Sequence, residues 1–136
     1  MVKVICGTKG SGKTKRMLDY ANQAQSEGHG SVVFIDDDDK YVFDLNRNIR
    51  FINVNDYDIK NASVMQGLII GLLAGNYDLE VVLLDGLLRI LPEKIDELEG
   101  FFASLDELAQ KNNIDIYIAV SEDPNVVPDY VKKAII

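Results

Sequence analysis

The amino-acid sequence predicts an α/β fold in one domain, residues 1–136, with a mostly parallel β-sheet between two helical layers: a three-layer α/β/α sandwich. Short apolar runs rich in Val and Ile alternate along the chain with longer segments in which apolar residues recur at helical spacing. This alternation is typical of parallel sheets that are covered on both faces. A length of 136 residues, 47% of them hydrophobic, suffices for one compact core and is short for two ordinary domains.

The first half of the chain predicts three strands and one helix. Residues 2–6 form a short apolar run with β-branched side chains, which indicates a strand. Apolar residues then recur at helical spacing from Lys13 until Gly28, where the helix is expected to end. Residues 31–35 predict a second, buried strand, and residues 50–54 a third. The repeating residues of the helix are Met17, Leu18, Ala21 and Ala24.

The second half predicts two more strands and three helices. Residues 61–74 are apolar on most sides, which indicates a buried helix. Residues 81–84 form an unbroken apolar run that is typical of a central strand. Pro92 suits the first turn of the next helix. Residues 114–120 predict the last strand, and residues 128–134 a short terminal helix. The apolar stripe of the helix after Pro92 is Ile95, Leu98, Phe102, Leu105 and Leu108.

The carboxyl ends of the predicted strands indicate where a ligand would bind. In open α/β sheets, ligands collect beyond these ends. The loops after Cys6, Ile35, Leu84 and Val120 should therefore lie along one edge of the sheet and form the functional site.

Composition disfavours several classes of partner. The net charge of -8 and a pI near 4.5 mean that the average surface repels nucleic acid and anionic lipid, so a nucleic-acid partner is disfavoured. The single cysteine, Cys6, lies in an apolar run, where free cysteines are usually buried, and this favours a reducing, cytoplasmic setting. No signal-like segment opens the chain, and the apolar segment 64–75 is shorter than the roughly 20 residues that cross a bilayer, so no membrane association is expected.

A glycine-rich segment, GTKGSGKT at residues 7–14, lies between the first strand and the first helix. It matches G-x-x-x-x-G-K-[ST], a pattern in which backbone N–H groups wrap phosphate oxygens at the positive end of a helix. Lys13 would reach the β- and γ-phosphates, and the Thr14 hydroxyl would bind Mg²⁺. A glycine-rich turn without a ligand is the alternative, which the flanking strand and helix disfavour. The predicted nucleotide-binding residues are Gly7, Thr8, Lys9, Gly10, Ser11, Gly12, Lys13, Thr14 and Lys15.

With these residues the chain resembles the P-loop NTPase superfamily, in which GTKGSGKT is the Walker A motif. The resemblance implies an acidic residue at the end of an apolar strand that holds Mg²⁺. In VVLLD, Asp85 takes this position and is the predicted Walker B residue, although an aspartate after a strand can also be a simple turn former. The resemblance therefore implies ATP and Mg²⁺ as ligands, Lys13 and Asp85 as catalytic residues, and Thr14 and Asp85 as metal ligands.

The chain departs from the RecA-like branch of this superfamily at one position. Many RecA-like ATPases carry a glutamate directly after the Walker B aspartate to position the attacking water, and this chain has Gly86. Ser121 stands where that branch often has a polar sensor and Glu122 follows it, but a plain turn is favoured for both. Lys9 is expected to face solvent or to add general positive charge at the ligand edge. The base-reading motif of GTPases is absent from the sequence, which favours ATP over GTP.

For several further residues the sequence allows either a functional or a purely structural role. Asp36 to Asp39 follow a strand at the predicted ligand edge, but a solvated loop is favoured, with Asp36 best placed if one of them acts. His29 has no partner at metal-binding spacing. The arginines Arg16, Arg47 and Arg89 are equal candidates for stabilising charge in phosphoryl transfer. The glycines Gly67, Gly71 and Gly75 share one helix face, for which packing against the protein's own sheet is favoured over a dimer contact.

Three functions fit these features. The first is an Mg²⁺-dependent ATP-binding protein with slow hydrolysis, whose nucleotide state is read by a protein partner. The second is a small-molecule kinase of the nucleoside type. Thymidine-kinase-like enzymes, however, carry Asp-Glu at the end of the Walker B strand and a zinc-binding lobe, whereas this sequence has Asp-Gly and no zinc-binding pattern. The third is an assembly module that binds nucleotide without hydrolysing it. The sequence indicates neither the partner nor the oligomeric state.

Overall fold

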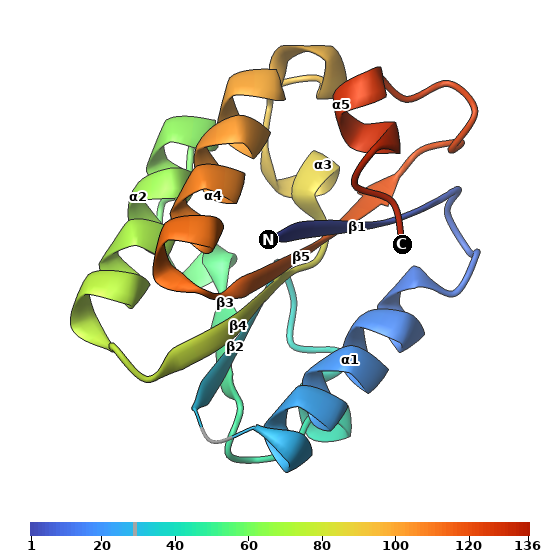
Figure 1. Cartoon of the computed structure of the whole chain (residues 1–136). Coiled ribbons are helices and arrows are strands. Elements are labelled where there is room, and N and C mark those ends of the chain that lie inside the picture. Colours follow the sequence, from blue (N-terminus) through green and yellow to red (C-terminus); the bar gives the residue numbers. More distant parts are fainter. Residues whose placement is uncertain (29) are drawn as a thin grey trace.

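The computed structural model describes residues 1–28 and 30–136, and it shows a five-stranded, all-parallel sheet with helices on both faces (Figure 1). The predicted α/β/α sandwich is confirmed. His29, for which the sequence predicts no metal role, lies outside the described residues. The strand order is β1-β5-β4-β2-β3. The strands are β1 (Val2–Gly7), β2 (Ser31–Asp36), β3 (Arg50–Asn53), β4 (Leu79–Leu84) and β5 (Asp115–Ser121).

The helices divide between the two faces of the sheet. Helix α1 covers one face, while α2 and α4 lie side by side on the other (Figure 1). The α-helices are α1 (Lys13–Glu27), α2 (Ala62–Gly75), α3 (Leu87–Ile90), α4 (Glu99–Asn112) and α5 (Asp129–Lys132), and the 3-10 turns are η1 (Val42–Asp44), η2 (Val54–Asp56) and η3 (Ile95–Glu97). Among the described residues, no helix combines the length and the apolar character needed to cross a membrane.

The central strands are mainly apolar because both faces of the sheet are covered. Along β2, Val33 and Ile35 pack in the core beneath α2 and α4, whereas Phe34 packs beneath α1. Strand β4 alternates in the same way, with Leu84 on the side of α2 and α4. Since successive side chains point to opposite faces, the next residue of each strand faces α1. This alternation places the polar residues at the ends of β2 and β4 on the same side of the sheet.

The helix predicted to begin at Pro92 begins instead at Glu99. The backbone turns at Gly86 into the short helix α3, which ends at Ile90 because the next residue, Leu91, precedes a proline and is disfavoured in helical conformation. The segment then forms η3, in which the Glu97 carboxylate accepts a hydrogen bond from the Lys94 N–H at 3.1 Å. A separate 3-10 turn therefore contains the first residue of the predicted stripe.

The glycine face of α2 points away from the sheet, so the predicted packing of these glycines against the sheet is wrong. Gly67, Gly71 and Gly75 are exposed, and a Cβ added at any of them would have no neighbour within 4 Å. The residues of α2 that are fully buried are Met65 and Ile69. Because the helix is apolar nearly all round, its sequence pattern did not indicate which face is buried.

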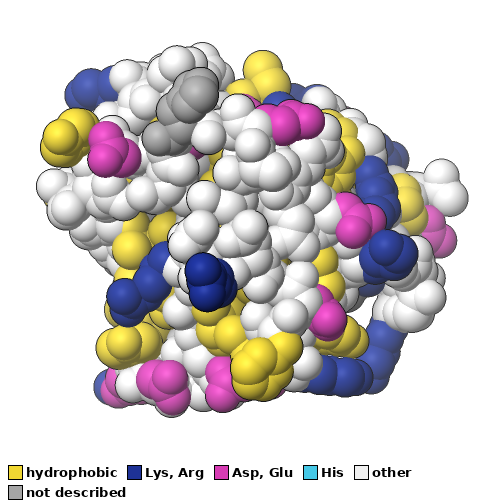
Figure 2. Space-filling view, turned by 90° about the horizontal axis from the view of Figure 1, so that it is seen from below, with side chains coloured by type: hydrophobic (Ala, Val, Ile, Leu, Met, Phe, Trp, Pro, Cys, Tyr) yellow, Lys and Arg dark blue, Asp and Glu magenta, His cyan; other side chains and the backbone are white. Residues whose placement is uncertain are grey.

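Strand β1 lies at one edge of the sheet and is flanked by the end of the chain. The Val4 N–H donates to the Ala134 carbonyl at 2.8 Å, and the Ile136 N–H donates to the Val4 carbonyl at 3.0 Å. Cys6, expected to be buried, is only half-buried, and its Sγ donates to the Glu122 carbonyl at 3.3 Å. On the face seen in Figure 2, acidic, basic and apolar side chains are interspersed.

Candidate functional site

The predicted ligand edge of the sheet carries a cleft of about 840 Å³. Its walls include the glycine-rich loop and the start of α1, together with residues at the ends of three strands: Asp36 of β2, Asp85 after β4 and Ser121 of β5. A second cavity, of about 510 Å³, lies between β1, α4 and α5 and contains none of the predicted site residues. The predicted residues therefore converge on the first cleft.

The glycine-rich loop, residues 7–14, has a backbone conformation that requires glycine at several positions. Gly10 and Gly12 have φ angles of 85° and 87°, in the left-handed region where glycine is favoured. A Cβ added at Gly7 would overlap the Ser11 hydroxyl. The loop closes on itself through the Ser11 N–H, which donates to the Thr8 carbonyl at 3.1 Å. The glycines thus allow a tight turn that leads directly into the first turn of α1, whose N–H groups have no partner within the helix.

Six of the nine predicted nucleotide-binding residues line the cleft: Lys9, Gly10, Gly12, Lys13, Thr14 and Lys15. Lys13 is buried, and its ammonium donates to the Thr8 carbonyl at 3.0 Å, so its charge is held inside the loop. Lys9 is exposed, as predicted. Lys15 is also exposed and pairs with Asp19 at 3.3 Å. Lys13 therefore carries the cation that is best placed to meet a bound anion.

The two predicted metal ligands meet in the cleft. The Thr14 hydroxyl donates to Oδ2 of Asp85 at 3.0 Å, although the residues are 71 positions apart and come from different elements. Asp85 is buried, and its Oδ1 accepts the Gly86 N–H at 2.8 Å, which fixes the carboxylate. Within the described chain no group of three or more His, Cys, Asp or Glu side chains could hold a metal ion. The pair nevertheless suits Mg²⁺, which is often held by one or two protein oxygens together with water and phosphate.

The acidic segment Asp36 to Asp39 does not form a uniformly solvated loop. Asp38 and Asp39 are exposed as expected, but Asp36 is only 2% exposed. Its Oδ1 accepts hydrogen bonds from the Asp37 N–H at 2.7 Å and from Nη2 of Arg89 at 3.3 Å. Burial raises the pKa of Asp36 to about 7. The prediction of a simple solvated loop is therefore wrong for the residue nearest the strand.

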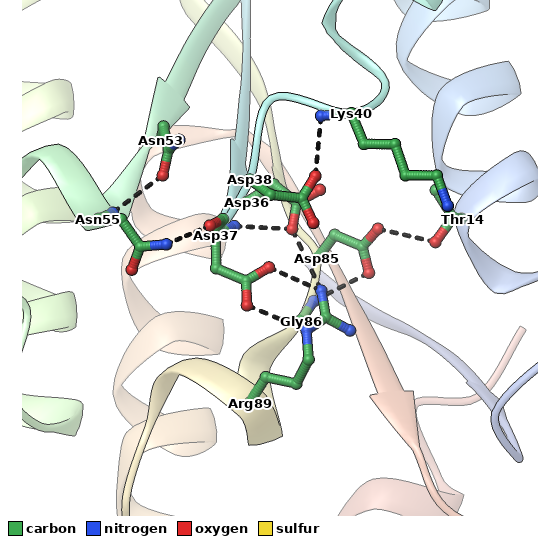
Figure 3. A network of polar contacts seen from close by, with 10 residues as sticks. All are labelled: Thr14, Asp36, Asp37, Asp38, Lys40, Asn53, Asn55, Asp85, Gly86 and Arg89. Carbon is green, nitrogen blue, oxygen red and sulfur yellow. Dashed lines mark hydrogen bonds and ion pairs between the residues drawn. The ribbon is translucent and has the colours of Figure 1, made fainter.

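Arg89 contributes a cation that sequence spacing did not single out. Its Nε donates to Oδ2 of Asp37 at 3.0 Å and its Nη2 to Oδ1 at 2.8 Å, a bidentate pair (Figure 3). The pair lowers the pKa of Asp37 and raises that of Arg89. Of the three candidate arginines, Arg89 lines the cleft. Arg16 donates a hydrogen bond to the Ile136 carbonyl, and Arg47 is exposed.

Two asparagines that the sequence analysis missed hold the acidic segment in place. Nδ2 of Asn53 donates to Oδ1 of Asp39 at 2.9 Å. Nδ2 of Asn55 donates to the Asp37 carbonyl (Figure 3). Asn53 is the last residue of β3, the strand that pairs with β2, and Asn55 follows it in η2. The available signal was their position at the end of a predicted strand, at the same edge as the aspartates.

Gly86 is required by its surroundings. Its φ is 73°, and a Cβ at this position would overlap Nη2 of Arg89. The guanidinium therefore fills the space into which a side chain at residue 86 would extend. At the end of β5, Ser121 belongs to the strand and lines the cleft, so the predicted plain turn begins only at Glu122.

Comparison with known proteins gives no match to a protein-family model and none to a curated protein.

Proposed function

We propose that the chain is an Mg²⁺-dependent ATP-binding protein, a slow NTPase or nucleotide-controlled switch that acts through a protein partner. The observation that carries this proposal is the 3.0 Å hydrogen bond between Thr14 and Asp85, directly beside the glycine-rich loop. A hydroxyl and a carboxylate at this separation can both enter the coordination shell of one hard cation. In a glycine-rich turn without a ligand, nothing would require these two oxygens to meet.

The roles follow from the positions of the side chains. The loop amides and Lys13 would bind the β- and γ-phosphates, and Thr14 and Asp85 would hold Mg²⁺ against them. The bound ion would neutralise charge that develops on the phosphates. Loss of the γ-phosphate would remove contacts from the loops around the cleft, and a partner could read the resulting change.

A non-hydrolysing assembly module is the second candidate. It is favoured by one observation: residue 86 is a glycine, and the guanidinium of Arg89 occupies the space where a glutamate side chain would extend. This candidate shares the nucleotide site with the first proposal and differs from it only in turnover.

The binding test compares Thr14→Ala with Ser26→Ala by calorimetric titration with ATP, in Mg²⁺ and in EDTA. Ser26 is an exposed residue near the other end of α1 and does not line the cleft, so its variant is a matched loss of a hydroxyl outside the site. Thr14→Ala should weaken ATP binding at least about tenfold in Mg²⁺ and leave it unchanged in EDTA, because only the metal contact is lost. Equal losses in both buffers would contradict a metal role for Thr14.

The turnover test follows phosphate release from Mg²⁺-ATP, alone and with a panel of nucleosides, with Lys13→Ala as the control. Slow release that the substitution abolishes supports the NTPase, whereas a phosphorylated nucleoside would support the kinase. ATP binding without either product would support the assembly module. If the wild-type protein binds neither ATP nor GTP, the proposal is wrong.

A further inference from the structure

The ends of β2 and β4 bring two carboxylates to one place. Ile35 pairs with Leu84 in the parallel ladder, and the Asp85 N–H continues it by donating to the Ile35 carbonyl at 2.9 Å. Asp36 and Asp85 therefore stand side by side at the strand ends, and both line the cleft. Asp85 is committed to Thr14 and the Gly86 amide, which leaves Asp36 as a second buried carboxylate at the same edge.

The hydrogen bonds of Asp36 and Asp37 separate their roles. Both oxygens of Asp37 are used by Arg89, and Asp37 is not part of the cleft wall. Within the described residues, the hydrogen bonds that Asp36 accepts go to Oδ1 alone, so Oδ2 remains available to a molecule in the cleft. The other carboxylates of the cleft wall, those of Asp19, Asp38 and Asp44, belong to exposed residues. Asp36 is thus the fixed, buried acceptor beside the metal pair.

We propose that Asp36 orients the water molecule that attacks the γ-phosphate, in place of a glutamate at residue 86, and that Arg89 is the residue that positions Asp36. This inference rests on the proposed nucleotide site. Oδ2 of Asp36 accepts a hydrogen bond from the water, whose oxygen forms a bond to the γ-phosphorus as the bond between that phosphorus and the β–γ bridging oxygen breaks. The bridging oxygen leaves with ADP, and the proton of the water leaves with inorganic phosphate. The contribution of Asp36 is to position the attacking water, as in other phosphoryl-transfer sites.

Arg89 holds the Asp36 carboxylate through Oδ1, the oxygen that does not contact the water. Its fork clamps Asp37 while Nη2 contacts Oδ1 of Asp36, so the rotation of the Asp36 carboxylate is restricted. The same guanidinium fills the space at Gly86. The acceptor therefore comes from the strand beside the Walker B strand, while the guanidinium of Arg89 lies where a side chain at residue 86 would extend.

The test compares Asp36→Asn with Asp39→Asn, a matched change in the same loop at an exposed residue outside the cleft wall. Calorimetry measures the Kd for Mg²⁺-ATP, and phosphate release measures turnover. Asp36→Asn should reduce turnover at least about 100-fold, while its Kd changes less than about threefold, because the residue contacts water and not phosphate. Asp39→Asn should change neither quantity.

Arg89→Lys provides a second readout, in the wild-type and the Asp36→Asn backgrounds. The lysine retains the charge but loses the fork, so turnover should fall in the wild-type background at unchanged KM. It should fall no further in the Asp36→Asn background, since the carboxylate to be positioned is gone. Wild-type turnover by Asp36→Asn, or a wild-type protein that binds Mg²⁺-ATP without releasing phosphate, overturns this inference and leaves the nucleotide site intact. A wild-type protein that does not bind nucleotide overturns the proposed function itself.

Discussion

The buried carboxyl group of Asp36 predicts that the fold is stabilised when its charge is removed. The pKa of Asp36 is raised from 3.8 to about 7, mainly by burial. In the pH range between these values the folded protein binds the proton more tightly than the unfolded chain does. The free energy of unfolding therefore falls as pH rises from about 4 to about 7 and is constant, as far as this group is concerned, at higher pH.

The substitution Asp36→Asn isolates this effect, because the amide oxygen can still accept the hydrogen bonds made to Oδ1. A pKa difference of about three corresponds to about 4 kcal/mol, at 1.36 kcal/mol per unit of pKa, and this is the upper limit of the gain. The variant should match the wild type near pH 4 and exceed its free energy of unfolding by up to about 4 kcal/mol at pH 8.

Urea denaturation of both proteins in EDTA, at intervals from pH 4 to pH 8, measures this difference directly. Taking the difference between two chains cancels the titration of the groups they share. The exposed Asp39, changed to Asn, should show a difference below about 0.5 kcal/mol at every pH. A gain that does not grow with pH, or a variant less stable than the wild type at pH 8, would refute the reasoning.

Three further predictions test other parts of the structure. Gly86→Ala should lower the free energy of unfolding by about 1–3 kcal/mol, because the residue has φ 73° and the new Cβ would overlap Arg89; an unchanged urea midpoint would contradict this. Gly67→Ala should raise it by about 0.5–1 kcal/mol, since α2 is exposed there and the added methyl group meets no neighbour; a loss would show that this face is covered. ATP should raise the Tm in Mg²⁺ and raise it less in EDTA, whereas equal shifts in the two buffers would contradict metal-assisted binding.

Much of the fold was predictable because it depends on local patterns. The strands are short, mainly apolar segments, and α1 has a regular stripe that ends before Gly28, so their bounds agree with the sequence to within one or two residues. The segment 87–98 was not predictable in this way. It contains a four-residue helix and a three-residue 3-10 turn, both too short to show a periodic pattern. The exposed face of α2 was missed for the opposite reason, since a helix that is apolar all round has no distinct stripe.

In the candidate site too, local sequence patterns predicted some residues, whereas the positions of others depend on tertiary structure. The glycine-rich loop and Asp85 could be predicted because each is a local pattern attached to one strand. The burial of Asp36 and its contact with Arg89 depend on β2 lying next to β4, and strand order is a tertiary property that spacing does not encode. The same is true of Asn55, which reaches the acidic segment only because β3 pairs with β2.

The overlap between residue 86 and Arg89 also limits how this site can change in evolution. A glutamate at residue 86 would need the volume that the guanidinium fills, so Arg89 would have to leave its present position. That change would leave Asp37 without its bidentate partner and remove the contact to Asp36. A side chain at residue 86 and the present contacts of Arg89 with the two aspartates therefore exclude each other.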